Sequence, residues 1–168
     1  MPFWRAYYHI VWATKNRQPW IAPQVEPRLF AYLVAQAVGL GAYVYAIGGT
    51  DDHVHLVATI PPSVSVSHFV KQLKGASAHD LNQHAPDFCV SWQRGYGVLT
   101  LGQRQRAVAE DYVRGQKQHH AQGMAQPWLE RTAEVDEGPP DTGVGRPDSI
   151  PGIAEKPQPY GLPGEAPF

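Results

Sequence analysis

The sequence predicts an α+β protein with a ferredoxin-like, split βαβ sandwich, in which helices cover one face of an antiparallel sheet. Three observations support this fold class. The apolar residues change between strand-like and helical spacing in the order β-α-β-β-α-β-α, two expected strands are separated by only two residues, and 168 residues are enough for one ordinary domain. Such a sandwich leaves the second face of its sheet free for a ligand or another subunit.

The first strand and the first helix follow from residue type and spacing. Residues 3–14 are dense in aromatic and β-branched side chains and precede a polar KNRQP segment, which predicts a strand. Residues 23–40 carry Leu29 and Leu33 at near-helical spacing, and Gly41 follows as a stop signal. This stretch is therefore predicted to be a helix.

The remaining elements complete the expected order. Residues 42–50 and 53–60 predict two strands of a hairpin, joined by a short Asp-Asp connection. A helix capped by a serine is expected over 65–82, and a further strand over 95–101. Residues 102–120 have helical spacing and predict a final helix.

Charge and composition divide the chain near residue 120. Residues 1–120 hold eleven Lys and Arg against seven Asp and Glu, whereas residues 121–168 hold three against eight and are rich in Pro and Gly. Acidic sequence of this kind buries too little apolar surface to offset the entropy of ordering it. We therefore predict one mildly basic folded domain over 1–120 and a disordered tail over 121–168.

Composition also excludes several classes of protein. No stretch approaches the roughly 20 apolar residues of a membrane helix, and the start of the chain does not resemble a signal peptide, so a soluble, unexported protein is expected. The single cysteine, Cys89, excludes an internal disulfide and a site built from several thiolates. Any metal would therefore be held by nitrogen and oxygen.

Two histidines lie two residues apart in the expected strand 53–60. Successive side chains of a strand point to opposite faces, so His53 and His55 should project together while Val54 and Leu56 enter a core. Two imidazoles about 7 Å apart at the backbone can converge on one divalent ion. The alternative is a pair of polar side chains on the wet side of a half-exposed strand.

A second candidate pair lies in the last helix. Tyr112 and Gln116 are four residues apart and would share a helix face, which could offer a hydroxyl nucleophile and a third metal ligand. Gly115 weakens this helix by about 1 kcal/mol relative to alanine. The alternative is a tyrosine whose ring packs on the sheet while its hydroxyl meets water.

Basic residues flank both candidate segments. We single out Lys71, Lys74, Arg94 and Arg114 as candidate contacts to a nucleic-acid backbone. A merely solvated basic surface is the alternative.

Taken together, these segments resemble a known family. The stretches YHIVWATKNRQP, DDHVHLVATIPP, SVSHFVKQLKG, YGVLTL and YVRGQKQHH occur in that order and resemble the single-tyrosine transposases of the IS200/IS605 type, members of the HUH nuclease superfamily. The resemblance covers residues 3–120. It implies that His53 and His55 bind a metal, that Tyr112 is the nucleophile and that Gln116 is an additional ligand.

The resemblance also implies a reaction and its partners. Such proteins cut and rejoin hairpin-bearing single-stranded DNA, and we expect Mg²⁺ or Mn²⁺ as cofactor, a 5′-phosphotyrosine on Tyr112 and a cytoplasmic, nucleoid-associated prokaryotic protein. A homodimer is expected, and in several relatives the tyrosine helix of one subunit serves the histidines of the other. Two alternatives stay open: a host-adopted relative that nicks repetitive palindromes, and a silent single-strand binder. The presence of both histidines, Tyr112 and Gln116 argues against the silent binder.

Overall fold

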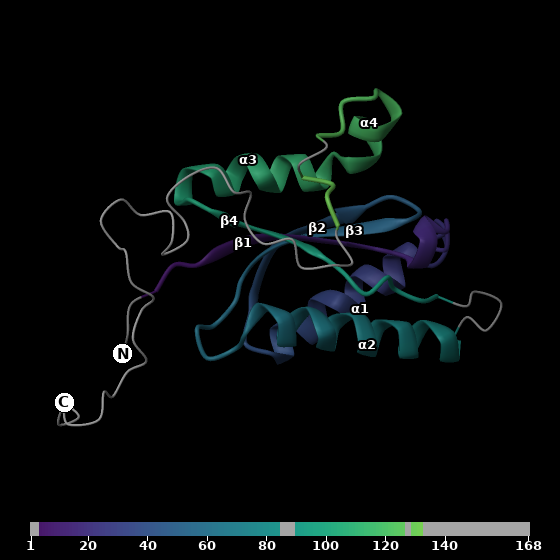
Figure 1. The fold of residues 1–168 in the computed structure, drawn as a ribbon, viewed down its shortest axis with the longest axis horizontal. Helices are drawn as coiled ribbons and strands as arrows, with labels where there is room; N and C mark the ends of the chain where they lie inside the picture. The colour runs from purple at the N-terminus through teal and green to yellow at the C-terminus, as the bar shows by residue number, and fades with distance from the viewer. Residues whose placement is uncertain (1–3, 85–89, 127–128, 133–168) are drawn as a thin grey trace, which may run out of the picture. The chain divides into compact units, whose positions relative to one another are not determined.

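The computed structural model describes residues 4–84, 90–126 and 129–132 (Figure 1). Contacts divide the chain into two units, Met1–Asp136 and Glu137–Phe168, and all described residues belong to the first. Most of the tail that the sequence predicts to be disordered lies outside the described residues. None of the helices in the described part is long and apolar enough to cross a membrane.

Four antiparallel strands form one sheet in the order β2-β3-β1-β4, the strand order of a ferredoxin-like fold. The strands are β1 (Tyr7–Ala13), β2 (Tyr43–Gly49), β3 (His53–Thr59) and β4 (Gly97–Leu101). The predicted α+β class and the hairpin of the two middle strands are confirmed. Strand β3 lies in the interior of the sheet, which explains why every one of its residues is buried.

Helices α1 (Glu26–Gly39) and α2 (Val66–His84) cover one face of the sheet, and a short 3₁₀ turn, η1 (Lys15–Arg17), follows β1 (Figure 1). The main core lies between these helices and the sheet. Its fully buried members are Ile10, Trp12, Leu29, Leu33, Ala37, Val54, Leu56, Ala58, Phe69 and Leu73. The predicted cap of α2 is present, because the Ser65 hydroxyl accepts a hydrogen bond from the His68 backbone at 3.2 Å.

The opposite face of the sheet carries helix α3 (Gln103–Arg114), which the sequence alone did not place there (Figure 1). Ala46, Val57, Tyr112 and Val113 form a second apolar cluster between α3 and the sheet. The helix approaches so closely that a Cβ built on Gly48 would lie 2.1 Å from the Val113 carbonyl oxygen. The face expected to be free is therefore partly occupied by the chain's own tyrosine helix.

The expected last helix is divided in two at Gly115. Helix α3 ends at Arg114, and α4 (Gln116–Ala121) begins directly after the glycine. The low helix propensity of glycine accounts for a break at this residue.

The folded domain, expected to end at residue 120, continues beyond it. Leu129 is buried in the second apolar cluster beside Val57 and Tyr112. Residues 129–132 are thus described as part of the first unit, although their composition places them in the acidic tail.

Candidate active site

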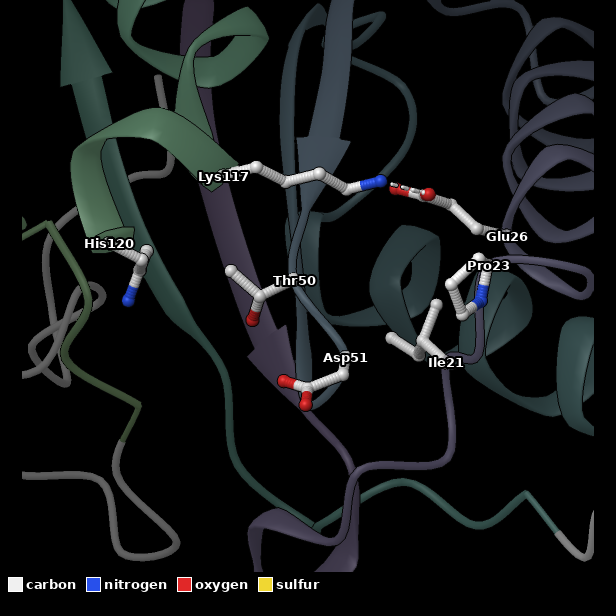
Figure 2. A pocket seen from close by; sticks show the side chains of 7 residues that line it. All are labelled: Ile21, Pro23, Glu26, Thr50, Asp51, Lys117 and His120. Carbon is white, nitrogen blue, oxygen red and sulfur yellow. Dashed lines mark hydrogen bonds and ion pairs between the residues drawn. The ribbon is translucent and has the colours of Figure 1, made fainter. Parts of the chain in front are cut away.

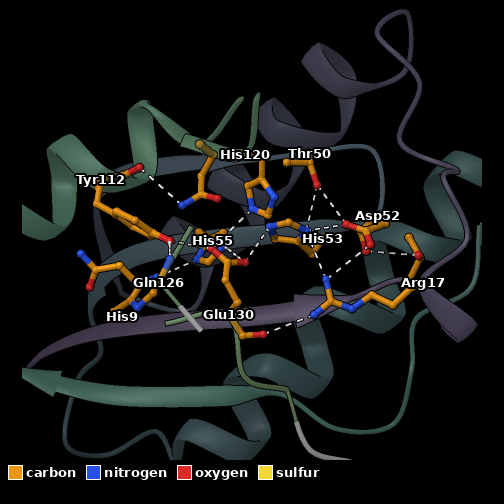
Figure 3. Close-up of polar contacts among 12 residues, drawn as sticks. His9, Arg17, Thr50, Asp52, His53, His55, Tyr112, His120, Gln126 and Glu130 are labelled. Atoms are coloured by element: carbon orange, nitrogen blue, oxygen red, sulfur yellow. Dashed lines mark hydrogen bonds and ion pairs between the residues drawn. The ribbon is translucent and has the colours of Figure 1, made fainter. Parts of the chain in front are cut away.

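The two histidines of β3 project to the α3 side of the sheet, as the alternation predicts. His53 is 1% exposed and His55 is fully buried, while Val54 and Leu56 lie in the main core on the other face. The rings of His53 and His55 meet edge to face with centroids 4.9 Å apart. The interpretation of two wet, half-exposed histidines is therefore wrong, and both rings lie within a buried polar cluster (Figure 3).

The ring of His53 is fixed from its Nδ1 side. This nitrogen lies 2.5 Å from the Asp52 carboxylate and 2.8 Å from the Thr50 hydroxyl, and the same hydroxyl donates to Asp52 at 2.9 Å. Burial would lower the pKa of His53, but contacts with the carboxylates of Asp52 and Glu130 raise it to about 9. For the acidic Asp52, burial alone would raise the pKa, but the hydrogen bond to His53 outweighs burial and lowers the pKa to about 2.

The ring of His55 is fixed by a third histidine. His55 Nδ1 lies 2.8 Å from Nε2 of His9, a buried residue of β1. Burial and the charge of His55 lower the pKa of His9 to about 3, and burial lowers the pKa of His55. Both rings are consequently uncharged at neutral pH, which leaves imidazole lone pairs available for a metal.

Tyr112 and Glu130 complete the cluster from the other side. The Tyr112 hydroxyl donates to Oε1 of Glu130 at 2.7 Å and accepts a bond from the Gln126 backbone at 3.1 Å. The other oxygen, Glu130 Oε2, lies 3.0 Å from Nε2 of His53 and 3.1 Å from Nε2 of His55. One carboxylate therefore joins the candidate nucleophile to both candidate metal ligands (Figure 3).

The cluster sets the protonation of Tyr112 and Glu130. Burial and the neighbouring Glu130 carboxylate raise the pKa of Tyr112, although the Gln126 amide opposes this shift. Burial would raise the pKa of Glu130, but hydrogen bonds from His53 and His55 outweigh it and hold the pKa far below its usual range. At neutral pH the phenol is thus protonated and the carboxylate charged.

Gln116 lies at the start of α4 and is 1% exposed. Its Nε2 donates a long bond of 3.4 Å to the Tyr112 carbonyl, and its Oε1 is buried with no hydrogen-bond partner among the described residues. The two residues remain four apart across the break at Gly115. Ligation by this unpaired amide oxygen stays a prediction.

The donor atoms of the cluster fit a divalent metal. One ligand atom each from His53, His120 and Glu130 lies within 4.8 Å of the other two. His53 Nε2 is buried and faces the Glu130 carboxylate at 3.0 Å, and the Gln116 amide oxygen is buried with no hydrogen-bond partner among the described residues. Such buried, unsatisfied polar atoms are costly unless another group satisfies them. Nitrogen and oxygen donors of this kind suit several divalent ions.

The four candidate DNA contacts do not share one surface. Lys71 and Lys74 belong to α2, on the face of the sheet opposite α3, and Lys74 donates to the carbonyls of Gln93, Arg94 and Gly95 at 2.5 to 3.1 Å. Arg94 is exposed beside these carbonyls. Arg114 lies on α3, where it pairs with Glu110 at 3.2 Å and donates to the Tyr45 carbonyl at 3.0 Å.

A pocket of about 320 Å³ opens beside the cluster (Figure 2). It is lined by Ile21, Pro23, Glu26, Thr50, Asp51, Lys117 and His120. At its rim Lys117 of α4 forms an ion pair with Glu26 of α1. Because His120 contributes to both, the pocket borders the group of candidate metal ligands.

The raised pKa of His53 predicts how the metal-free protein responds to pH. A charged His53 stabilises the folded state fully below its unfolded pKa of about 6.5, and this contribution is lost as the pH rises through about 9. We expect a loss of about 2–3 kcal/mol between these pH values. The measurement is thermal unfolding in EDTA across this range. His53→Gln should flatten the profile, and an equally steep profile in that variant would assign the effect to another group.

Sequence reasoning missed Glu130 and His120 as candidate metal ligands. Glu130 lies in a segment whose acidic, Pro/Gly-rich surroundings predict disorder, and no spacing relates it to the histidine pair. His120 also has no spacing that relates it to the histidine pair, yet its Nε2 lies 3.5 Å from Glu130 and its ring centroid lies 4.9 Å from that of His53. The His-His pair near the end of α4 was the signal available for His120.

Fold and site together define a single-tyrosine transposase of the HUH class: a tyrosine helix packs over two strand histidines on a ferredoxin-like sheet. Residues 2–116 match the family model described as "Transposase IS200 like". The chain belongs to the family of IS200-like transposases.

Characterised relatives and solved structures agree with this assignment. The chain is 30% identical over 115 residues to the ISDra2 transposase TnpA of Deinococcus radiodurans, covering 65% of this chain and 82% of the relative. It is 29% identical over 126 residues to the transposase for insertion sequence element IS200 of Salmonella typhimurium, covering 71% of this chain and 82% of that relative. A crystal structure of a candidate transposase from Deinococcus radiodurans R1 is similar with a TM-score of 0.56 and 30% identity, covering 69% of this chain and 95% of that chain.

A second solved structure shares the fold alone. It is a REP-associated tyrosine transposase bound to a REP hairpin, with a TM-score of 0.54 and 14% identity, covering 74% of this chain and 76% of that one.

Proposed function

We propose that this chain cleaves and rejoins single-stranded DNA at hairpin-bearing element ends through a covalent 5′-phosphotyrosine on Tyr112. One observation carries the proposal: within a single chain, the Tyr112 hydroxyl and the Nε2 atoms of His53 and His55 all lie within 3.1 Å of the Glu130 carboxylate. A hydroxyl nucleophile beside a cluster of metal-binding donors is an arrangement suited to covalent, metal-assisted phosphoryl transfer.

Each residue of the site has a role in the proposed cleavage step. A divalent cation, Mg²⁺ or Mn²⁺, held by His53, His55 and Gln116 would neutralise charge on a nonbridging phosphate oxygen. Because the raised pKa of Tyr112 keeps its phenol protonated at neutral pH, the proton must leave as the oxygen attacks phosphorus. The phosphorus bond to the 3′ oxygen breaks, and that oxygen takes up a proton through water.

The covalent product makes rejoining possible without an energy cofactor. The phosphotyrosine ester retains the bond energy of the original phosphodiester. A second DNA 3′-OH can therefore attack it, release Tyr112 and join two strands. This reversibility accounts for a reaction that needs no ATP.

Substrate and assembly remain part of the proposal. The hairpin in the REP-associated structure supports a hairpin-bearing DNA partner by analogy of fold. Lys71, Lys74, Arg94 and Arg114 stay predicted backbone contacts, with Lys74 held mainly by carbonyls of its own chain. A homodimer also stays a prediction, while the Tyr112 ring lies against His55 of its own chain here. A cytoplasmic, nucleoid-associated site of action accords with such a DNA partner.

The proposal is tested by trapping the covalent product. The full chain is incubated with labelled single-stranded hairpin oligonucleotides and Mg²⁺ or Mn²⁺, and denaturing gels are read for a protein–DNA band. His53→Ala should reduce this band at least 100-fold because it removes a candidate metal ligand. His68→Ala, an exposed histidine on α2, is the matched control and should leave it unchanged. Normal adduct formation by His53→Ala would contradict the metal assignment, and no band with the unmodified protein would contradict the proposed function.

A further inference from the structure

Glu130 is held in the site by contacts on both sides of it in the chain. Leu129 is buried in the second apolar cluster, and the Arg131 carbonyl approaches β4 so closely that a Cβ on Gly97 would lie 2.2 Å from its oxygen. Arg17 donates to the backbone carbonyl of Glu130 at 3.3 Å. The carboxylate is therefore placed by its own segment of chain.

The two oxygens of this carboxylate face different partners. Oε2 lies 3.0 Å from Nε2 of His53 and 3.1 Å from Nε2 of His55, whereas Oε1 accepts the Tyr112 hydroxyl at 2.7 Å. The opposite nitrogens of both rings are already engaged, with Asp52 in one case and His9 in the other. Metal-bound histidines are typically oriented by such partners on their second nitrogen. The free direction of each ring therefore points to the place where Oε2 lies.

The negative charge of Glu130 favours metal binding beside His53 and His55. An imidazole binds a metal in its neutral form, so two histidines and an amide oxygen would bring no negative charge, whereas Mg²⁺ and Mn²⁺ favour charged oxygen ligands. The Gln116 amide oxygen is buried without a hydrogen-bond partner among the described residues, so it is available as an uncharged ligand. A carboxylate oxygen at this position adds the charge that the predicted ligands lack.

We infer that Glu130 is a carboxylate ligand of the divalent metal, placed beside His53 and His55, and that its second oxygen positions the Tyr112 hydroxyl. The inference rests on the proposed metal-assisted function and names a ligand outside the motifs that carry the family resemblance.

The experiment measures Mn²⁺ binding to the full chain without DNA, by isothermal titration calorimetry and by loss of the free Mn²⁺ electron paramagnetic resonance signal. Glu130→Gln keeps the shape of the side chain and removes its charge, and should weaken Mn²⁺ binding at least tenfold. The matched control is Asp111→Asn, which removes a carboxylate beside Tyr112 that is 86% exposed and should leave binding unchanged. Thermal unfolding in EDTA verifies that each variant is folded.

A second variant leaves every candidate ligand in place. Gly97→Ala adds a Cβ against the Arg131 carbonyl, so the Glu130 segment must move. Weakened Mn²⁺ binding in a folded Gly97→Ala protein is expected and supports the inference even if Glu130→Gln is unstable. Unchanged binding in both variants would overturn it.

One contrary outcome has a definite meaning. If Glu130→Gln binds Mn²⁺ like the unmodified protein and forms adduct faster, the carboxylate occupies the place of the DNA phosphate instead of binding the metal. The proposed function is judged separately by the adduct of the unmodified protein. If the unmodified protein forms no adduct but Glu130→Gln loses Mn²⁺ binding, the proposed reaction is rejected while the assignment of Glu130 as a metal ligand stands.

Discussion

Replacing Tyr112 by phenylalanine will abolish the covalent protein–DNA adduct while leaving binding of the hairpin oligonucleotide intact. The substitution removes only the phenol oxygen, which is the atom proposed to attack phosphorus, and retains the ring that packs against Val57 and Val113. Metal binding should persist, because neither histidine is altered. Adduct yield on denaturing gels and hairpin affinity by fluorescence anisotropy are the two measurements.

The loss of the hydroxyl has a modest structural cost that must be separated from chemistry. The Tyr112 hydroxyl bonds to Glu130 and to the Gln126 backbone, so Tyr112→Phe should destabilise the metal-free protein by about 1–2 kcal/mol. Tyr43→Phe, on an exposed tyrosine of β2, should leave adduct yield unchanged.

Mixing the inactive variants tests which chain supplies the tyrosine. Tyr112 lies against His55 and shares the Glu130 carboxylate with His53 in the same chain, so Tyr112→Phe mixed with His53→Ala should stay inactive. Recovery of the adduct would show that the tyrosine acts on a partner chain. A persistent adduct in Tyr112→Phe alone would remove this residue from its role.

Substituting Gly48 by alanine will displace the tyrosine helix. The added Cβ would lie 2.1 Å from the Val113 carbonyl oxygen and 3.0 Å from its carbon, and both atoms belong to the backbone of α3. Helix and sheet must therefore separate, at a cost of about 2–3 kcal/mol. Since a displacement of about 1 Å can reduce a reaction about 100-fold, adduct yield should fall by that order.

A second glycine provides the matched control. Gly75 lies within α2 with nothing within 4 Å of an added Cβ, so Gly75→Ala should stabilise the protein by about 0.5–1 kcal/mol and preserve adduct yield. Thermal unfolding and the adduct assay report on both variants. A Gly48→Ala protein with unchanged stability and full yield would show that α3 does not pack against β2 in solution.

The spacing of apolar residues predicted most of the helices and strands. A strand or helix that buries one face must repeat its apolar residues with the period of that structure. The alternation of β3 placed Val54 and Leu56 in the core and His53 and His55 together on the other face, as observed. The spacing of Leu29 and Leu33 likewise located α1. Boundaries shifted by a few residues, and the final helix broke where Gly115 already weakened it.

The sequence by itself determined the order of elements, the strand histidines and the candidate tyrosine, since local spacing expresses each of them. Only the tertiary structure decided that α3 packs over the sheet beside its own histidines and that Glu130 and His120 join them. The physical reason is that contacts between residues 53 and 130 follow from chain packing, and no local period encodes them. For Glu130 the composition predicted the opposite, since it lies in an acidic, glycine- and proline-rich stretch that we expected to be disordered. The structure shows that such a stretch can still place one carboxylate in the site.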